Sequence, residues 1–141
     1  MTGWAAPGFS WPVRIYWEDT DGGGVVYYAN YLKFLERART EWLRSLGIAQ
    51  NELAKDPGVV FVVSNITVDY RRPARLDDAL VVTCQCERDR ATCIRFEQRI
   101  LRNDELIAEA AVRVVCIDAK SFRPTRLPAA VVNAVSVKEP V

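Results

Sequence analysis

Hydrophobic and polar positions repeat with two different periods along this chain of 141 residues. From Tyr31 to Leu46, apolar side chains return every three to four residues, which predicts one long amphipathic helix that stops at Gly47. Its apolar stripe comprises Tyr31, Leu35, Ala38, Trp42 and Leu46, widened by Leu32 and Leu43. The charged residues between these positions face the opposite way, so we expect the stripe to pack on another layer of the fold.

The remaining periodic segments alternate every two residues or are rich in β-branched residues, and both patterns predict strands. The expected strands are residues 13–18, 59–72, 80–87, 92–101 and 105–117. In the second of these, alternation puts Val60, Val62, Ser64, Ile66, Val68 and Tyr70 on one face and Phe61, Val63, Asn65, Thr67 and Asp69 on the other. Polar turns at residues 88–90 and 102–104 join the last three strands, so these strands should be antiparallel neighbours.

Five strands and one long helix predict an α+β fold, in which an antiparallel sheet wraps its apolar face around the helix. Residues 13–135 would form this single domain, between a flexible N-terminal arm at residues 1–12 and a C-terminal tail at residues 136–141. Apolar residues on both faces of the strand at 59–70 exceed what one helix can cover. We therefore expect a homo-oligomer.

Composition narrows the possible functions. The chain has 19 Lys and Arg against 18 Asp and Glu, and this balance argues against nucleic acid as a partner. No apolar run is long enough for stable membrane insertion, and the N-terminus lacks the pattern of a secretory signal, so we expect a cytoplasmic protein. The sequence contains no histidine, which excludes Ser-His-Asp and Cys-His catalysis. Its four cysteines form no Cys-x-x-Cys pair, so we expect reduced thiols, no metal site and no cofactor.

The segment between the first strand and the helix contains Asp19 and Asp21, followed by three consecutive glycines. One interpretation is a plain polar turn, because Asp and Gly are the commonest turn residues. The other is a carboxylate held beside the unpaired N–H groups of a helix N-terminus, an arrangement suited to chemistry on a carbonyl group. Spacing alone favours the plain turn slightly.

Three segments resemble a known family: residues 16–27, 31–41 and 68–78. The first is the most specific, because it joins the Asp-x-Asp pair to a Gly-Val step and an aromatic pair. In element order and in these motifs, the chain resembles the hotdog-fold thioesterases of the 4-hydroxybenzoyl-CoA thioesterase family, in particular its Tol-Pal-associated acyl-CoA thioesterase branch. The resemblance covers residues 13–128 and overturns the preference for a plain turn.

The resemblance implies hydrolysis of a short-chain or aromatic acyl-CoA, with Asp21 as nucleophile or general base. Backbone N–H groups near Tyr28 would polarise the thioester carbonyl, and Gly24 and Val25 would contact the substrate. The Tol-Pal-associated branch has a histidine where this chain has Tyr28, so the acyl preference is open. Asp19 is expected to be a structural carboxylate of the loop.

The resemblance also implies a site shared between subunits of a dimer, which often pairs again into a tetramer. Arg88 and Arg90 would bind the CoA phosphates, although a solvated turn is an equally good interpretation. Asn65 of a second copy would face Asp21. The basic residues at positions 71, 72 and 75 are further candidates for CoA, or for ion pairs with Asp77 or Asp78.

Two other functions stay open at this point. One is a non-catalytic acyl-binding or scaffold protein of the same fold, associated with an envelope (Tol-Pal) machinery. Such a protein needs neither Asp21 nor the glycine loop. The other is a dehydratase of this fold, which ranks last because those enzymes use a catalytic histidine.

Overall fold

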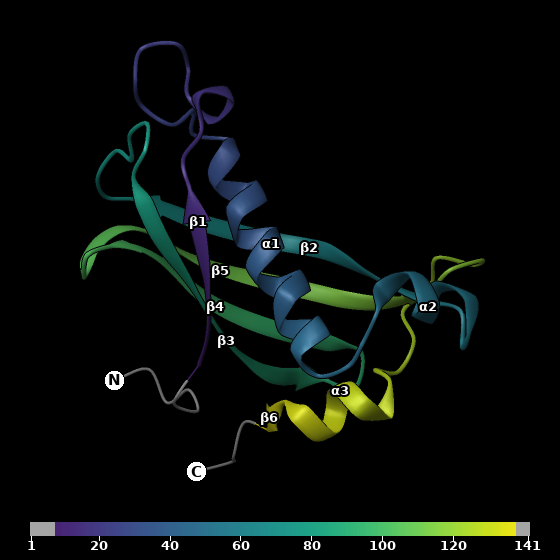
Figure 1. Cartoon of the computed structure of the whole chain (residues 1–141). Helices are drawn as coiled ribbons and strands as arrows, with labels where there is room; N and C mark the ends of the chain where they lie inside the picture. Colours follow the sequence, from purple (N-terminus) through teal and green to yellow (C-terminus); the bar gives the residue numbers. More distant parts are fainter. Residues whose placement is uncertain (1–7, 138–141) are drawn as a thin grey trace.

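The computed structural model describes residues 8–137, which fold into one curved sheet with a helix across it (Figure 1). The strands are β1 (Phe9–Arg14), β2 (Val59–Tyr70), β3 (Ala79–Arg90), β4 (Cys93–Arg102), β5 (Glu105–Asp118) and β6 (Ser136–Val137). Their order in the sheet is β1-β3-β4-β5-β2, and each of these neighbours is antiparallel. The predicted α+β class and five-stranded antiparallel sheet are therefore confirmed. The two-residue β6 is an addition, and it pairs in parallel with β3.

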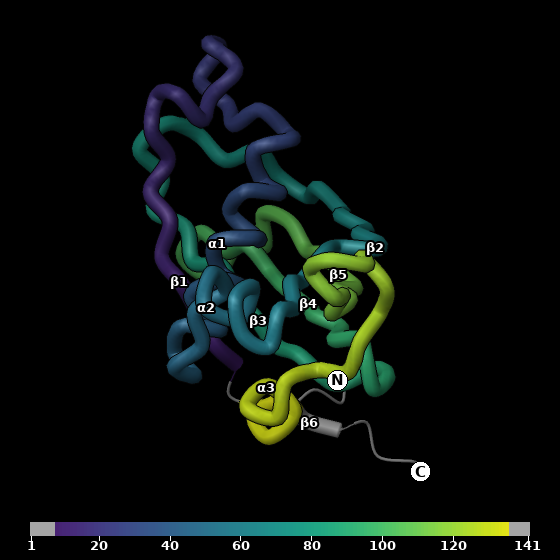
Figure 2. The backbone as a smooth tube through the Cα atoms, turned by 90° about the vertical axis from the view of Figure 1, so that its right-hand side faces the viewer, coloured from purple at the N-terminus to yellow at the C-terminus, as the bar shows by residue number. Residues whose placement is uncertain are grey.

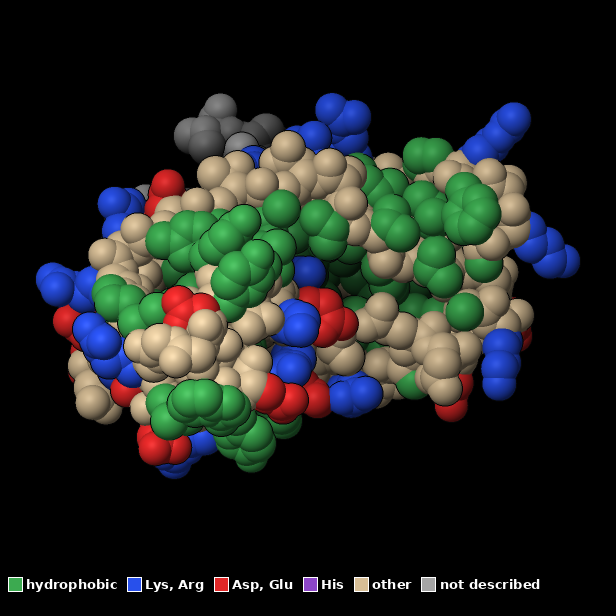
Figure 3. Space-filling view, turned by 90° about the horizontal axis from the view of Figure 1, so that it is seen from above, with side chains coloured by type: hydrophobic (Ala, Val, Ile, Leu, Met, Phe, Trp, Pro, Cys, Tyr) green, Lys and Arg blue, Asp and Glu red, His purple; other side chains and the backbone are tan. Residues whose placement is uncertain are grey.

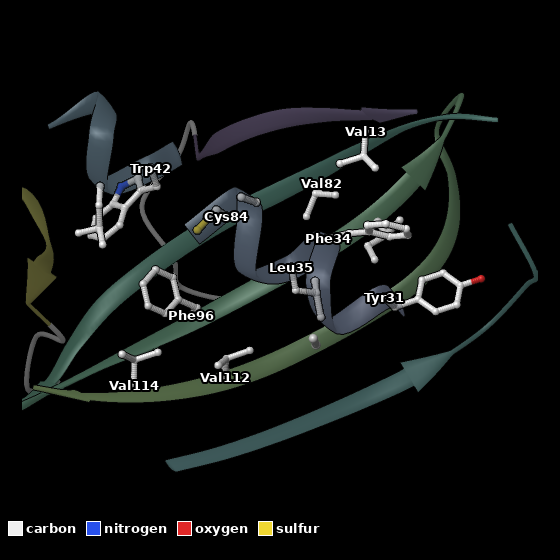
Figure 4. Packing of buried hydrophobic residues seen from close by; sticks show 14 of the residues in the cluster. Val13, Tyr31, Phe34, Leu35, Trp42, Val82, Cys84, Phe96, Val112 and Val114 are labelled. Atoms are coloured by element: carbon white, nitrogen blue, oxygen red, sulfur yellow. The ribbon is translucent and has the colours of Figure 1, made fainter. Parts of the chain in front are cut away.

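The long helix is α1, Asn30–Ser45, which lies across one face of the sheet. Its buried side chains are Tyr31, Phe34, Leu35, Ala38, Trp42 and Leu43. Figure 4 shows Phe34, Leu35 and Trp42 among sheet residues such as Val82, Phe96 and Val112. Sequence periodicity predicted this stripe except for Phe34, which is fully buried, and Leu32, which is exposed.

Three short helices complete the chain: η1 (Trp17–Asp19), α2 (Gln50–Lys55) and α3 (Ala129–Ala134). The sequence predicted only a connector where α2 forms, and a terminal helical turn where α3 forms. Figure 2 shows the loop before α1 at one end of the molecule, and α3 with β6 at the other. The candidate site therefore lies far from the C-terminal segment.

The first strand lies earlier in the sequence than expected. β1 ends at Arg14, so the expected strand at residues 13–18 is wrong, and residues 9–12 of the expected arm pair with β3. The chain leaves the strand because the Asp19 carboxylate accepts the N–H of Tyr16 at 2.8 Å, which folds the following residues into η1. Residues 1–7 and 138–141 of the expected arm and tail lie outside the described residues.

The two faces predicted for residues 59–70 are wrong beyond the middle of the strand. Val63 pairs with Val114, but Asn65 pairs with Arg113, so Ser64 is an extra residue in a β-bulge. One inserted residue exchanges the faces. Phe61 packs on the core before the bulge and Ile66 packs on it afterwards. The strand is therefore apolar mainly on one face, and this weakens the argument that two apolar faces require an oligomer.

The predicted hairpin between β3 and β4 forms, but its turn lies at residues 91–92 and not at 88–90. β3 continues to Arg90, where Arg88 pairs with Ile94 and Arg90 pairs with Cys93 across an irregular register. Arg88 also pairs with Val137 of β6. Pairing with β4 and β6 therefore keeps this charged segment in β3, although the sequence pattern predicts a turn there.

Candidate active site

The loop between η1 and α1 is held by backbone pairing and by one carboxylate. Thr20 and Val26 form an isolated bridge, and the N–H of Asp21 donates to the carbonyl of Val25 at 2.9 Å. The carboxylate of Asp19 caps η1, and its carbonyl accepts the N–H of Tyr27 at 3.1 Å. Asp19 is therefore a structural residue of the loop, as the sequence predicted.

Asp21 stands at the tip of this loop with an exposed side chain. Its Oδ1 accepts the N–H of Gly23 at 2.7 Å, which orients the carboxyl group. Its Oδ2 accepts no hydrogen bond within the part of the chain that the structure describes. Gly22 and Gly24 have φ angles of 86° and 91°, a region that other residues enter at a cost. The glycines thus allow the loop to present one free carboxylate oxygen to solvent.

The entry of α1 offers hydrogen-bond donors. Ala29 is the N-cap residue, and no side chain caps the helix. The N–H groups of Tyr28 and Ala29 have no acceptor among residues 8–137, whereas the N–H of Asn30 donates to the carbonyl of Tyr27 at 2.8 Å. The Asn30 side chain donates to the carbonyl of Asp19 at 2.8 Å and so joins helix and loop. Two free N–H groups at the positive end of α1 can bind an oxyanion.

A group of tyrosines fixes the position of this helix entry. The Tyr70 hydroxyl donates to the carbonyl of Tyr28 at 3.0 Å, and the two rings meet edge to face at 6.3 Å. Tyr31 packs against Tyr70 at 5.3 Å, and its hydroxyl accepts the N–H of Ala74 at 3.0 Å. Burial raises the pKa of Tyr31 and of Tyr70, so both phenols stay protonated and keep these hydrogen bonds.

The turn at residues 73–78 supports the loop from the other side. The N–H of Val26 donates to the carbonyl of Ala74 at 2.8 Å, and the N–H of Leu76 donates to the carbonyl of Gly24 at 3.3 Å. Arg102 in turn holds this segment, because it contacts Asp78 at 2.6 Å and the carbonyl of Pro73 at 3.2 Å. The loop is therefore braced by parts of the chain 48 or more residues away in sequence.

Not every predicted site residue lies near the Asp21 loop. Gly24 and Val25 belong to the loop, where the carbonyl of each accepts a backbone hydrogen bond. Asn65 lies on the outer face of the sheet opposite α1, beside Arg113, and is not near Asp21. The two basic candidates for CoA, Arg88 and Arg90, stand at the far end of β3.

Two of the three other basic candidates are engaged in ion pairs, although not in those expected. Arg71 contacts Glu109 at 2.8 Å, and Arg72 contacts Glu105 at 3.3 Å. Neither pairs with Asp77 or Asp78, because Arg102 takes Asp78. For Arg75 the hydrogen bond to Asp78 comes from its backbone N–H, at 2.8 Å.

The sequence did not predict roles for Tyr70 or Arg102. Tyr70 was placed only on a face of its strand, and Arg102 in a polar turn. A signal was present in both cases, since a phenol at the end of a long strand and an arginine closely followed by Asp104 and Glu105 each need a partner. What the sequence does not give is the partner, because Tyr70 and Tyr28 are 42 residues apart.

Two general features bear on the site. Among the described residues there is no group of three or more side chains suited to hold a metal ion, and no helix has the length and apolar character to span a membrane. All four cysteines are free, and burial raises the pKa of Cys86 to about 12. Cys84, Cys93 and Cys116 are buried and Cys86 is half-buried, whereas the side chain of Asp21 is exposed.

Known proteins share this sequence and fold. Residues 15–135 match the family model described as thioesterase-like superfamily. An acyl-CoA thioesterase YbgC from Haemophilus influenzae is 46% identical over 121 residues, 86% of this chain and 89% of that protein. An acyl-CoA thioester hydrolase YbgC from Escherichia coli is 48% identical over 125 residues, 88% of this chain and 92% of that protein.

A solved structure of a probable thioesterase from Bartonella henselae is 35% identical, with a TM-score of 0.81 over 86% of this chain and 99% of that chain. A 1,4-dihydroxy-2-naphthoyl-CoA thioesterase from Synechocystis has a TM-score of 0.85 and 25% identity, over 90% of this chain and 94% of that chain. The match to the family model spans the Asp21 loop, α1 and the strands β2 to β5. The chain therefore belongs to the thioesterase-like superfamily, as its motifs predicted.

Proposed function

We propose that this protein hydrolyses acyl-CoA thioesters to a free acid and CoA, with Asp21 as the catalytic carboxylate. The relatives from Haemophilus influenzae and Escherichia coli carry this activity in their names and match nearly the whole chain. The observation that carries the assignment is local. One free carboxylate oxygen of Asp21 and two free N–H groups, of Tyr28 and Ala29, belong to a single braced loop and helix entry.

The chemistry follows from these groups. The N–H of Tyr28 stabilises the oxyanion that forms when the thioester carbonyl is attacked. Asp21 either attacks the carbonyl itself or takes a proton from the attacking water. In both cases the carbon–sulfur bond breaks, the thiolate of CoA leaves, and water supplies the oxygen of the free acid. Gly24 and Val25 shape the loop that holds the reacting atoms.

Several finer features remain proposals. We infer that α1 is the central helix of a hotdog fold, because its six buried side chains pack on the sheet. The short-chain or aromatic acyl group, the cytoplasmic location and the dimer or tetramer stay predictions. So do the CoA contacts of Arg88 and Arg90 and the role of Asn65 in a second copy.

The decisive experiment measures free-thiol release from a panel of short-chain, medium-chain and aromatic acyl-CoAs. Asp21→Asn keeps the shape of the side chain and removes its negative charge, so kcat should fall by roughly 10²–10⁴-fold. Asp19→Asn is the matched control, because its carboxylate holds Tyr16 rather than facing solvent, and it should cost less. Wild-type turnover by folded Asp21→Asn would rule out the catalytic assignment.

The alternative function is a non-catalytic acyl-binding or scaffold protein associated with the Tol-Pal machinery. It predicts binding without turnover. If the purified wild-type protein releases thiol from no member of the panel, this alternative takes precedence over the enzyme.

A further inference from the structure

A cavity of about 120 Å³ lies between α1 and the sheet, beside the edge strand β2. Most of its wall is apolar. The lining side chains include Trp42, Leu43, Phe61, Val63, Phe96 and Val114. Figure 3 shows hydrophobic side chains on both sides of a hollow on the face seen from above. An apolar cavity of 150 Å³ is known to hold a benzene molecule, so this one has room for about one such group.

One wall of the cavity carries a positive charge. Arg39 of α1 donates from Nη1 to Oε1 of Gln98 at 3.0 Å, and its guanidinium lies 6.0 Å from the centre of the Phe96 ring. Gln98 is fully buried on β4, and its Nε2 donates to the carbonyl of Leu35 at 3.0 Å. Gln98 thus has both polar atoms satisfied and holds Arg39 in one orientation.

Arg39 is half-buried and forms no ion pair with a carboxylate of the described residues. Among the residues that the structure describes, none of the ion pairs within 4.0 Å includes Arg39. Its only hydrogen bond there goes to the neutral amide of Gln98, so most of its five donors are unused. Burial lowers the pKa of Arg39, and the weaker opposing effects of Cys84 and Glu36 do not reverse this. A fixed, unpaired cation in an apolar wall is suited to an anionic ligand on an apolar stem.

We propose that this cavity binds the far end of the substrate's acyl group, and that Arg39 selects acyl chains that end in a carboxylate. The proposal rests on the thioesterase function proposed above and specifies its substrate class. The ligand is an ω-carboxyacyl-CoA, in which the apolar chain fills the cavity wall and the terminal carboxylate pairs with the guanidinium.

The helix defines a path from the reacting carbonyl to the cavity. Leu32 and Glu36 are four residues apart in α1, so they lie on one face of the helix, and Tyr28 stands in the turn just before the helix begins at Asn30. Tyr28 and Leu32 are exposed, and Glu36 is at the cavity. The helix rises about 9 Å from Asn30 to Glu36, and the two-residue turn from Tyr28 brings the span to about 12 Å. An extended chain advances about 1.2 Å per bond. An acyl chain that reaches Arg39 should therefore have about ten carbons, longer than the short-chain group expected from the sequence.

Glu36 is the one carboxylate in the cavity lining, and it opposes an anionic ligand. Its Oε1 accepts the hydroxyl of Thr40 at 3.0 Å, and Gln50 donates to the same hydroxyl at 3.2 Å. Glu36 is therefore held at the exposed rim, while Arg39 is held inside by Gln98. Removing the Glu36 charge should strengthen the preference for a terminal carboxylate.

The test compares decanedioyl-CoA with decanoyl-CoA, which differ only at the far end. Wild-type protein should show a kcat/KM about tenfold higher for the dicarboxylic chain, the size of one charge-assisted contact. Arg39→Met should remove this preference by lowering kcat/KM for decanedioyl-CoA about tenfold more than kcat/KM for decanoyl-CoA, and Glu36→Gln should increase the preference. Succinyl-CoA and butyryl-CoA are too short to reach Arg39, so their ratio should not respond to Arg39→Met. Arg39→Lys keeps the charge without the planar fork and should retain part of the preference.

Other outcomes overturn the proposal. Equal losses on both ten-carbon substrates would make Arg39 a structural tie between α1 and β4. A second result would also overturn it: wild-type protein shows no preference, and Arg39→Met converts an oligomer into a monomer. The cavity would then hold a carboxylate of a second copy. If the protein turns over no acyl-CoA, the proposed function fails. Calorimetry then tests separately whether the cavity binds a chain that ends in a carboxylate. Decanedioate should then bind wild type more tightly than decanoate does, and Arg39→Met should equalise the two; equal binding by the wild type would refute the site.

Discussion

At the scale of single residues, Arg102 carries much of the support for the candidate loop. Its guanidinium joins Asp78, Glu105 and the carbonyl of Pro73, and it therefore ties the turn at 73–78 to the β4–β5 hairpin. Partial burial by itself raises the pKa of Asp78, but hydrogen bonds from the Arg75 N–H and from Arg102 bring it below its ordinary value of 3.8. The hydrogen bond from Arg102 likewise lowers the pKa of Glu105 below 4.5.

Lowered carboxylate pKa values make the contribution of Arg102 depend on pH. The stabilisation is complete above the ordinary values of 3.8 and 4.5, and it is lost as pH falls through the lower folded values. Arg102→Met should therefore lower the Tm at pH 7, and the difference from wild type should shrink in more acidic buffer. Thermal unfolding of both proteins, at pH 7 and at a pH below the ordinary carboxylate pKa values, measures the effect. Arg99→Met is the control, because Arg99 makes only an exposed 3.8 Å pair with Glu97 and should change little. A pH-independent Tm loss in Arg102→Met would contradict the linkage.

At the scale of elements, α1 ends as its sequence predicted. Gly47 has a φ of 79° and donates its N–H to the carbonyl of Arg44, while the N–H of Ile48 returns to the carbonyl of Leu43. A Cβ at Gly47 would meet no atom within 4 Å, so any cost of replacing it comes from the backbone angle alone.

Gly47→Ala should lower the free energy of unfolding by about 1 kcal/mol, because alanine enters the left-handed region at that cost. For a domain of this size the Tm should fall by about 3 °C. Gly47→Asn is the control, since asparagine tolerates this conformation better and should lose less. Thermal and denaturant unfolding measure both variants. An unchanged Tm in Gly47→Ala would show that the helix end rearranges without cost.

At the scale of the whole molecule, β2 leaves one edge of the sheet open. Along it, Val62, Val63 and Tyr70 are exposed by 40%, 47% and 46%. An exposed strand edge with apolar side chains is a ready surface for pairing with another chain. We therefore still expect a homo-oligomer, now from this edge rather than from two apolar faces. Light scattering at micromolar concentration tests it, and a particle of 15.9 kDa would contradict it.

The length of β3 bears on the prediction that Arg88 and Arg90 bind the CoA phosphates. They lie at the opposite end of β3 from Ala79, which adjoins the loop, and eleven residues of strand span about 36 Å. CoA bound at Asp21 can therefore meet these arginines only on a second copy. Arg88→Ala with Arg90→Ala should raise KM for acyl-CoA about tenfold in the oligomer, with kcat unchanged. A thioester that lacks the nucleotide should not distinguish the mutant from wild type. An unchanged KM at low salt would place the phosphates elsewhere.

The sequence by itself determined the features that depend on neighbours in the chain. These features are the apolar period of α1, its end before Gly47, the order of the helix and strands along the chain, and the glycine-rich loop. All of them follow from interactions within a few residues. The structural role of Asp19 belongs with them, because its carboxylate caps a turn only three residues away. The motifs that identified the superfamily are local in the same sense.

The tertiary structure decided the features that depend on distant partners. Pairing with β3 placed β1 at residues 9–14 and kept Arg88 in a strand, since a neighbouring strand supplies hydrogen bonds that composition does not reveal. Pairing with β5 introduced the bulge at Ser64, and one extra residue reverses every side chain after it. Arg39 and Gln98 are 59 residues apart, and only the packing of α1 on β4 brings them together. A buried polar pair of this kind has no periodic signature, because its energy depends on a partner that local sequence does not specify.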